Sequence, residues 1–321
     1  MGVVENGMAW FESIRQLKVI PAARGGIRWR CLRTLPLLLI LAGPAPGAAQ
    51  TAIPAAIESG QDPVLATKDG LLTATFSDAT DDAALSAAVP ALIAKGVQSV
   101  ILRSDPIRDI GPLARIAGLR KLDICATRVR DVTALAALTE LRSLNLQFLQ
   151  ISDLRPLAKL AELRSLNIGG TDVQDLAPLA GLTNLQDLVV AVTKIADLRP
   201  LAPLNQMVSL DVDNTWVSNI RPLAGMNYLQ RLKLNGTLVA DIQSLGGLAN
   251  LRELDLAATN VSDIRPLARL TNLRALNIEG TQVNDLTPLA ALTALRSVDV
   301  GGSRVSDITP LAHLPELEIR R

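Results

Sequence analysis

The sequence predicts an α/β solenoid, in which a concave parallel β-sheet is backed by short 3-10 or helical turns on the convex side. The first observation behind this prediction is a repeat: residues 97–316 divide into ten segments of 22 residues with no insertion or deletion. Self-similarity at such a period is the signature of solenoid folds. The second is the pattern inside each segment, where a short apolar/polar alternation is followed by an aspartate and a proline. This pattern predicts one strand and one tight turn per coil.

Composition limits the function classes. Hydrophobic residues make up 49% of the 321 residues, which is too many for a disordered chain, while aromatic residues make up only 2%. Leu, Ile, Val and Ala must therefore fill the core. A net charge of +1 gives no electrostatic footprint for nucleic acid. Two cysteines, Cys31 and Cys125, are too few for a disulfide framework.

The strand half of each repeat begins with L-x-x-L-x-L, as in residues 251–256 (LRELDL). Because side chains alternate across a strand, repeat positions 4 and 6 face the core and positions 3, 5 and 7 face outward. Each coil then has to return and place its strand beside the preceding one. The expected result is a parallel sheet of ten short strands.

The return half contains D-[LIV]-x-P-L-A, as in residues 263–268. Position 13 is Asp in nine repeats and Asn219 in the tenth, and we expect it to cap a short helical turn. Proline follows at position 16 in eight repeats, where its missing N–H costs little. Position 17 is Leu in all ten, and position 9 is Thr in seven. We expect the threonine hydroxyl to bond main-chain groups of the adjoining coil.

These strings are the leucine-rich repeat pattern, and T-x-V-S-D-I-R-P-L-A-x-L-T-N-L-R-x-L (259–276) resembles the 22-residue repeats of bacterial internalins. It is also similar to the leucine-rich regulatory subunit of a eukaryotic protein phosphatase. The resemblance covers the ten repeats. It implies a leucine-rich repeat horseshoe and a binding role, but it does not identify the partner.

The flanking segments have separate predicted roles. Residues 1–49 resemble a secretory signal peptide, with basic residues before the apolar run 35–41 and small residues before a cleavage site that we place after Ala49. The expected location is therefore secreted or periplasmic, with no stable membrane span once the leader is removed. Residues 50–79 are predicted to be a linker with one strand at 71–76, and residues 80–96 a capping helix that Pro90 kinks or splits. Residues 317–321 begin a truncated eleventh repeat, whose open edge could self-associate.

Catalytic chemistry is not expected. The chain has no P-loop, GxSxG, HExxH or CxxC motif, so we predict no enzyme activity and no cofactor. His313 is the only histidine and is interpreted as a surface residue. Cys125 is at an outward repeat position, either as a reactive thiol or, more simply, as a small tolerated side chain. One carboxylate per coil at position 13 does not supply the six to eight oxygens that calcium prefers, so no metal site is expected.

The candidate site is the middle of the concave face and its rim. Large apolar residues replace small or polar ones at positions 5, 8 and 10, and charged residues lie nearby in neighbouring repeats. Exposed aromatic residues beside charges are typical of binding hot spots. The predicted partner-binding residues are Phe148, Val189, Val192, Asp211, Asp213, Trp216, Arg231, Lys233, Leu238, Glu253 and Asp255.

The leading hypothesis is a secreted or periplasmic module that binds a protein partner through the concave face without catalysis. Two alternatives remain open: an intracellular regulatory scaffold similar to the phosphatase subunit, and a self-associating structural protein. The compartment and the mature N-terminus distinguish the first two, and gel filtration of the intact and truncated chain tests the third.

Overall fold

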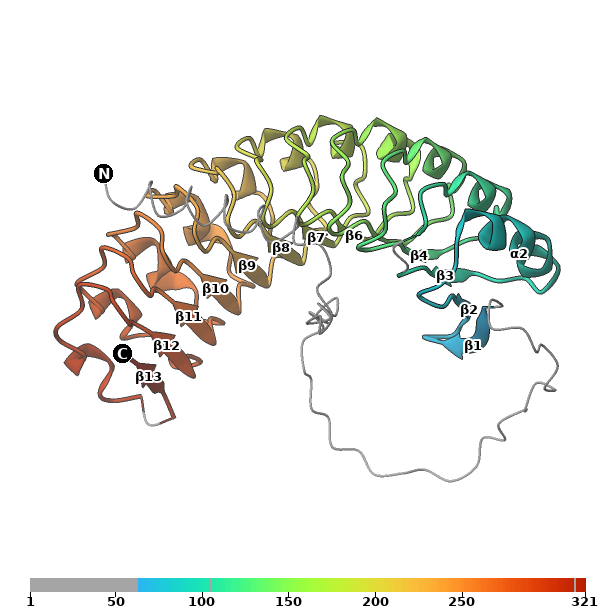
Figure 1. The fold of residues 1–321 in the computed structure, drawn as a ribbon. Coiled ribbons are helices and arrows are strands. Elements are labelled where there is room, and N and C mark those ends of the chain that lie inside the picture. Colours follow the sequence, from blue (N-terminus) through green and yellow to red (C-terminus); the bar gives the residue numbers. More distant parts are fainter. Residues whose placement is uncertain (1–62, 104–105, 315) are drawn as a thin grey trace, which may run out of the picture. The chain divides into compact units, whose positions relative to one another are not determined.

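The computed structural model describes residues 63–103, 106–314 and 316–321. The proposed signal peptide at 1–49, its cleavage site and the first part of the predicted linker, residues 50–62, lie outside the described residues. Contacts divide the chain after Asp62, and the unit Pro63–Arg321 contains the whole repeat domain. In this unit the strands line the concave side and the short helical turns lie on the convex side (Figure 1).

The sheet has thirteen strands in sequential order, and each strand pairs with its neighbours in the chain. Only β1 and β2 pair antiparallel among the described strands, and every later pairing is parallel. Equivalent repeat positions face each other across the sheet, as Leu232, Leu254 and Leu276 do. The strands are β1 (Val64–Lys68), β2 (Leu71–Thr75), β3 (Ser99–Ile101), β4 (Lys121–Asp123), β5 (Ser143–Asn145), β6 (Ser165–Asn167), β7 (Asp187–Val189), β8 (Ser209–Asp211), β9 (Arg231–Lys233), β10 (Glu253–Asp255), β11 (Ala275–Asn277), β12 (Ser297–Asp299) and β13 (Glu318–Arg320).

A 3-10 helix forms the convex side of each repeat, as the D-x-x-P-L-A strings predict. The leucine at repeat position 17 lies in every one of these turns and is at most 1% exposed, from Leu113 to Leu311. The helices are Gly111–Arg115, Thr133–Ala137, Arg155–Lys159, Ala177–Leu179, Arg199–Leu201, Arg221–Leu223, Gln243–Gly247, Arg265–Arg269, Thr287–Leu289 and Thr309–Leu311. Aliphatic side chains from both halves of each coil meet between sheet and turns in one continuous core.

The position 13 residue starts each 3-10 helix. In all ten repeats its Oδ1 accepts a hydrogen bond from the backbone N–H two residues later, which belongs to the first residue of the turn. The Asp175–Ala177 bond, for example, measures 2.8 Å. Asn219 makes the same bond at 3.1 Å, because an amide oxygen accepts as a carboxylate does. The bonded backbone N–H holds the pKa of Asp131 below its usual value.

The threonine column at position 9 corrects one expectation. We expected the hydroxyl to reach the adjoining coil, but it donates to the carbonyl three residues earlier in its own coil, from Thr215 Oγ1 to Val212 O at 2.7 Å. The reason is local geometry, because the chain turns back on itself directly after the strand. Leu149 replaces this hydroxyl in repeat 3 and is fully buried instead. The same bond recurs in the repeats that carry Thr127, Thr171, Thr193, Thr237, Thr259, Thr281 and Ser303.

The segment before repeat 1 contains a hairpin and a helix. Residues 64–75 form two strands, β1 and β2, where we had expected one, because Asp69 and Gly70 adopt positive φ and reverse the chain. Helix α2 (Asp82–Ala94) lies inside the segment predicted to cap the solenoid. Pro90 lies within this single continuous helix, so it does not split the helix into two pieces. Asp82 Oδ1 accepts the backbone N–H groups of Arg108 and Asp109, which joins the helix to repeat 1.

The threonine column generates a stability prediction. Thr215→Val keeps the side-chain shape but leaves the buried carbonyl of Val212 without its hydroxyl donor, so the free energy of unfolding should fall by about 1–2 kcal/mol. Urea denaturation followed by circular dichroism measures it. Thr215→Ser keeps the donor and is the matched control. If the Val and Ser variants unfold at the same urea concentration, the hydroxyl hydrogen bond does not contribute to stability.

Candidate protein-binding face

The position 5 column of the concave face has a structural role that the sequence pattern did not disclose. In seven repeats an Asp or Asn there accepts the backbone N–H two residues later, for example Asp255 Oδ1 from Ala257 N at 3.0 Å. This bond closes the turn where each strand ends. These side chains therefore hold the backbone with one oxygen, and the second carboxylate oxygen of Asp, or the amide nitrogen of Asn, is left for other contacts.

Lys233 breaks this column because an ammonium group cannot accept a hydrogen bond. The neighbouring coil compensates: Asp213 Oδ1 accepts the backbone N–H of Asn235 at 2.8 Å. The backbone of repeat 7 is thus held by a carboxylate from repeat 6. Lys233 is left free of that backbone role and lies between the position 5 carboxylates of the two adjacent strands, Asp211 and Asp255.

Of the predicted charged side chains, Lys233 pairs with Asp211, whereas Arg231 pairs with Asp187, which was not predicted. Lys233 Nζ lies 3.3 Å from Asp211 Oδ2, and Arg231 Nη2 lies 3.6 Å from Asp187 Oδ1, two coils away. Burial alone would lower the pKa of Lys233, but the nearby carboxylates, that of Asp211 first, raise it above its usual value. Glu253 lies beside Arg231 in register, is exposed, and forms no ion pair with any described residue.

Asp213 is the most perturbed carboxyl of this group. Burial, reinforced by the negative charge of Asp211, raises the pKa of Asp213 to about 7, although the N–H of Asn235 acts in the opposite direction. Burial also raises the pKa of Asp255 and of Asp187, and Arg231 partly offsets the effect on Asp187. The carboxylates of this face are crowded and only partly neutralised by the two cations.

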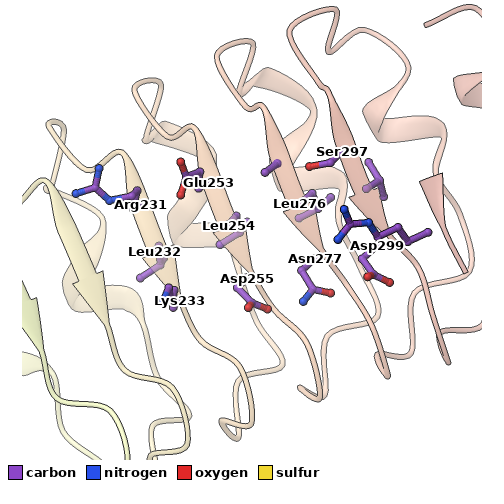
Figure 2. Close-up of a pocket in the computed structure, with 13 residues that line it drawn as sticks. Arg231, Leu232, Lys233, Glu253, Leu254, Asp255, Leu276, Asn277, Ser297 and Asp299 are labelled. Atoms are coloured by element: carbon purple, nitrogen blue, oxygen red, sulfur yellow. The ribbon is translucent and has the colours of Figure 1, made fainter. Parts of the chain in front are cut away.

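A hollow of about 250 Å³ lies on the same face, over strands β9 to β13. Figure 2 shows Lys233, Asp255, Asn277 and Asp299 in a row at the carboxyl ends of their strands, with Arg231, Glu253 and Ser297 in a second row. Four of the predicted site residues (Arg231, Lys233, Glu253 and Asp255) line this hollow. Asp187, Asn277, Asp299 and Arg320 were not among the predicted residues, although the outward positions 3 and 5 of repeats 5, 9 and 10 would have identified the first three.

The predicted apolar residues lie where the chain leaves the strands. Trp216 and Leu238 are 49% and 44% exposed and occupy position 10 of adjacent coils. Their backbone N–H groups donate to Ile195 and Val217 of the preceding coil, so the two residues are stacked in register. Phe148, at position 8 of repeat 3, is 41% exposed. Tyr228, which precedes β9 by three residues, is also exposed and lies at the opposite end of the strands.

Phe148 and Val192 adopt a backbone conformation that large side chains avoid. Position 8 has positive φ in every described repeat that includes it, and Gly, Ala or Asn occupies it in most. Phe148 and Val192 have φ of 62° and 59°, which costs on the order of 1–2 kcal/mol each. The ring of Phe148 lies over Gly170, where a Cβ would collide with it. Val192 and Val189 are half-buried, so they contribute less exposed surface than Phe148.

We compared the chain with known protein families, curated proteins and solved structures. No protein-family model matches the chain, and no curated protein matches it. Among solved structures, an internalin of Listeria monocytogenes shares 27% identity over 75% of this chain and 76% of its own, with a TM-score of 0.64. Internalin C2 of the same organism shares 29% identity over 64% of this chain and 82% of its own, with a TM-score of 0.53. The chain is an internalin-like leucine-rich repeat protein.

More distant structures share the fold alone. The leucine-rich repeat ectodomain of a plant membrane receptor kinase from Arabidopsis thaliana, solved in complex with CASPARIAN STRIP INTEGRITY FACTOR 2, is 22% identical over 70% of this chain and 29% of its own, with a TM-score of 0.62. The repeat architecture is therefore common to proteins of different lengths and sources. Among the described residues of this internalin-like chain, no helix is long and apolar enough to cross a membrane.

The structure also places the residues that the sequence offered for metal binding or catalysis. No group of three or more His, Cys, Asp or Glu residues among them could hold a metal ion. Cys125 is fully buried, which corrects the expectation of an outward-facing side chain. His313 is exposed, and its Nε2 donates to the Ala290 carbonyl of the preceding coil at 2.8 Å. This face presents exposed apolar side chains together with carboxylates that Arg231 and Lys233 only partly neutralise.

The raised pKa of Asp213 generates a pH prediction. Unfolding returns this carboxyl to its usual pKa near 3.8, so the folded state binds more protons than the unfolded state between about pH 4 and pH 7. Stability should therefore fall as pH rises through this window. Asp213→Asn keeps an oxygen for Asn235 N–H and removes the charge, so its melting temperature should exceed that of the unsubstituted protein at pH 8 by about 2–4 °C and match it near pH 4.

Thermal melts at several pH values measure this difference. Glu279→Gln, at the same repeat position three coils away and exposed, is the control and should not change the pH profile. A melting-temperature difference that is the same at pH 4 and pH 8 would contradict the assignment of the titration to Asp213.

Proposed function

We propose that this internalin-like chain is a non-catalytic module that binds a protein partner through the concave face of its sheet and the adjoining edge. The observation that carries the proposal is the stacked pair Trp216 and Leu238, two large apolar side chains nearly half exposed in adjacent coils. A chain whose aliphatic residues are otherwise almost all buried has no packing reason to expose them. Stacked repeats of this kind form extended concave binding surfaces.

Rigid presentation is the proposed mechanism. The side chains of the face project from a sheet whose strands are held on both sides, so ordering on binding costs little. Trp216 and Leu238 act as anchors in a region that also contains Asp211, Asp213, Arg231, Lys233, Glu253 and Asp255. Phe148 extends the apolar edge toward repeat 3, and Val189 and Val192 fill the half-buried surface between Phe148 and Trp216.

We also propose that the protein acts outside the cytoplasm, in the periplasm or the medium. The support is the sequence of residues 1–49, with its basic stretch, short apolar run and small residues before Gln50. The partner would then be an envelope or extracellular protein.

Trp216→Ala tests the binding face. The immobilised protein is used to capture partners from envelope and medium fractions of the source organism, and a captured protein is then purified and titrated against each variant. Loss of a centrally placed tryptophan anchor should weaken its affinity about tenfold or more. The melting temperature should stay nearly unchanged, because the ring is not part of the core.

Tyr228→Ala is the matched control, since it removes an exposed aromatic ring at the other end of the strands. If the partner binds the Trp216→Ala and Tyr228→Ala variants equally well, the proposed binding face is contradicted. Unfolding of the Trp216→Ala variant would instead show that the ring belongs to the core.

Mass spectrometry of the native protein after cell fractionation tests the location. A mature chain that starts at Gln50 and is recovered from the periplasm or medium is the expected result, because small residues precede the proposed cleavage site. An intact N-terminus in the cytosol would contradict it and favour the intracellular scaffold.

A further inference from the structure

The outward positions of the concave face differ in charge between the two ends of the solenoid. Positions 3, 5 and 7 of repeats 1–4 carry one carboxylate, Asp123, and two cations, Arg103 and Lys121. The same positions of repeats 5–10 carry two cations, Arg231 and Lys233, and seven acidic side chains: Asp187, Asp211, Asp213, Glu253, Asp255, Glu279 and Asp299. Asp213, with its pKa of about 7, is only partly ionised at neutral pH, so it adds less negative charge than a fully ionised carboxylate. The negative charge is therefore concentrated on strands β7 to β12, and the chain's near-neutral overall charge conceals it.

The cations of this surface do not neutralise it, and Arg320 of β13, which also lines the hollow, pairs with Glu318 of its own strand at 2.9 Å. Arg231 and Lys233 pair with Asp187 and Asp211, at 3.6 and 3.3 Å. Glu253 has no ion-pair partner among the described residues, although Arg231 is its neighbour in register. The position 5 carboxylates bond backbone N–H groups through Oδ1, and for Asp255 no cation among the described residues lies within ion-pair distance.

A metal ion does not account for this excess, because no group among the described residues is arranged to hold one. The carboxylates are instead distributed one or two per strand along the sheet, which suits an extended cationic molecule better than a point charge. Exposed apolar side chains follow two of the same strands along the chain: Trp216 comes three residues after Asp213, and Leu238 occupies the position of Trp216 in the next coil. Tryptophan offers the strongest aromatic face for Lys or Arg.

We propose that the sheet face over β8 to β11, with Trp216 and Leu238 at its edge, docks a Lys/Arg-rich segment of the partner protein that also carries an apolar side chain. This inference rests on the proposed protein-binding function and adds the chemistry of the partner. The cationic side chains lie against Glu253 and Asp255 over the hollow of β9 to β13. The apolar side chain packs on Trp216 and Leu238. Complementary charge speeds association and selects against acidic partners.

The test is a selection of random peptides displayed on phage, carried out on the full chain. The expected winners are rich in Lys or Arg and carry at least one aromatic or large aliphatic residue. A winning peptide is synthesised and titrated by fluorescence anisotropy at low and high salt. Its affinity should fall as salt increases, because salt screens partly exposed charges.

The variant Glu253→Gln/Asp255→Asn removes two carboxylates and keeps the backbone bond of position 5, which Asn277 makes naturally. Affinity for the winning peptide should fall about fivefold or more. The control Glu162→Gln/Asp175→Asn removes the same charge away from the concave positions and keeps the turn bond that Asn219 makes naturally. It should not change affinity.

The outcomes separate this inference from the proposed function. Winning peptides without a basic bias, whose binding is lost in Trp216→Ala, would overturn the partner chemistry and leave the binding face in place. Peptides insensitive to both Trp216→Ala and the carboxylate variant would overturn both. If no peptide is enriched, the inference about the partner's chemistry is overturned. The proposed function is not, because the titration of the captured partner tests it separately. Self-association abolished by the carboxylate variant would assign the face to a second copy.

Discussion

One short hydrogen bond organises this molecule: a side-chain oxygen accepts the backbone N–H two residues later. It occurs at the end of most strands, at position 5, and at the start of every 3-10 helix, at position 13. Each bond fixes a change of direction, and two such changes per 22 residues bring every strand back beside its predecessor. Parallel pairing and the leucine core are the result, because equivalent positions are superimposed from coil to coil.

This dependence explains why the side chains that close the turns also set the charge of the concave face. A position 5 carboxylate accepts the backbone N–H with one oxygen and leaves the other for neighbouring side chains, as Asp211 does toward Lys233, so the acidic character of the face is compatible with its stability. Lys233 is the informative exception. It gives up the backbone bond of its own coil, and Asp213 supplies that bond from the preceding coil. The lysine at this position also places a cation between the carboxylates of Asp211 and Asp255 on the adjacent strands.

The sequence was sufficient for the repeat, the strand and turn positions and the core, because a strict period leaves one arrangement that superimposes the leucines. It also identified Trp216, Leu238 and Phe148 as exceptions to their columns, and all three are exposed. It did not reveal the hydrogen bond that Thr215 makes within its own coil. Nor did it reveal that Asp213 accepts the backbone N–H of Asn235, the bond that Lys233 cannot make. Both bonds depend on which backbone group lies nearest to the side chain. Phe148 stood out in the sequence only because it is larger than the other residues at position 8. Its left-handed backbone conformation was not predicted, because the size of a side chain does not determine φ.

The packing of Phe148 over Gly170 has a consequence for how such a protein can change over time. Tandem repeats of equal length are prone to gain or lose a unit by unequal recombination, and a uniform solenoid would tolerate it. Here, loss of residues 163–184 would bring Val192 beneath the ring of Phe148 in place of Gly170, where there is no room for a β-carbon. Asn214 over Gly236 makes a second such pair. Side chains that reach across coil boundaries thus oppose the loss of a single unit among the central repeats.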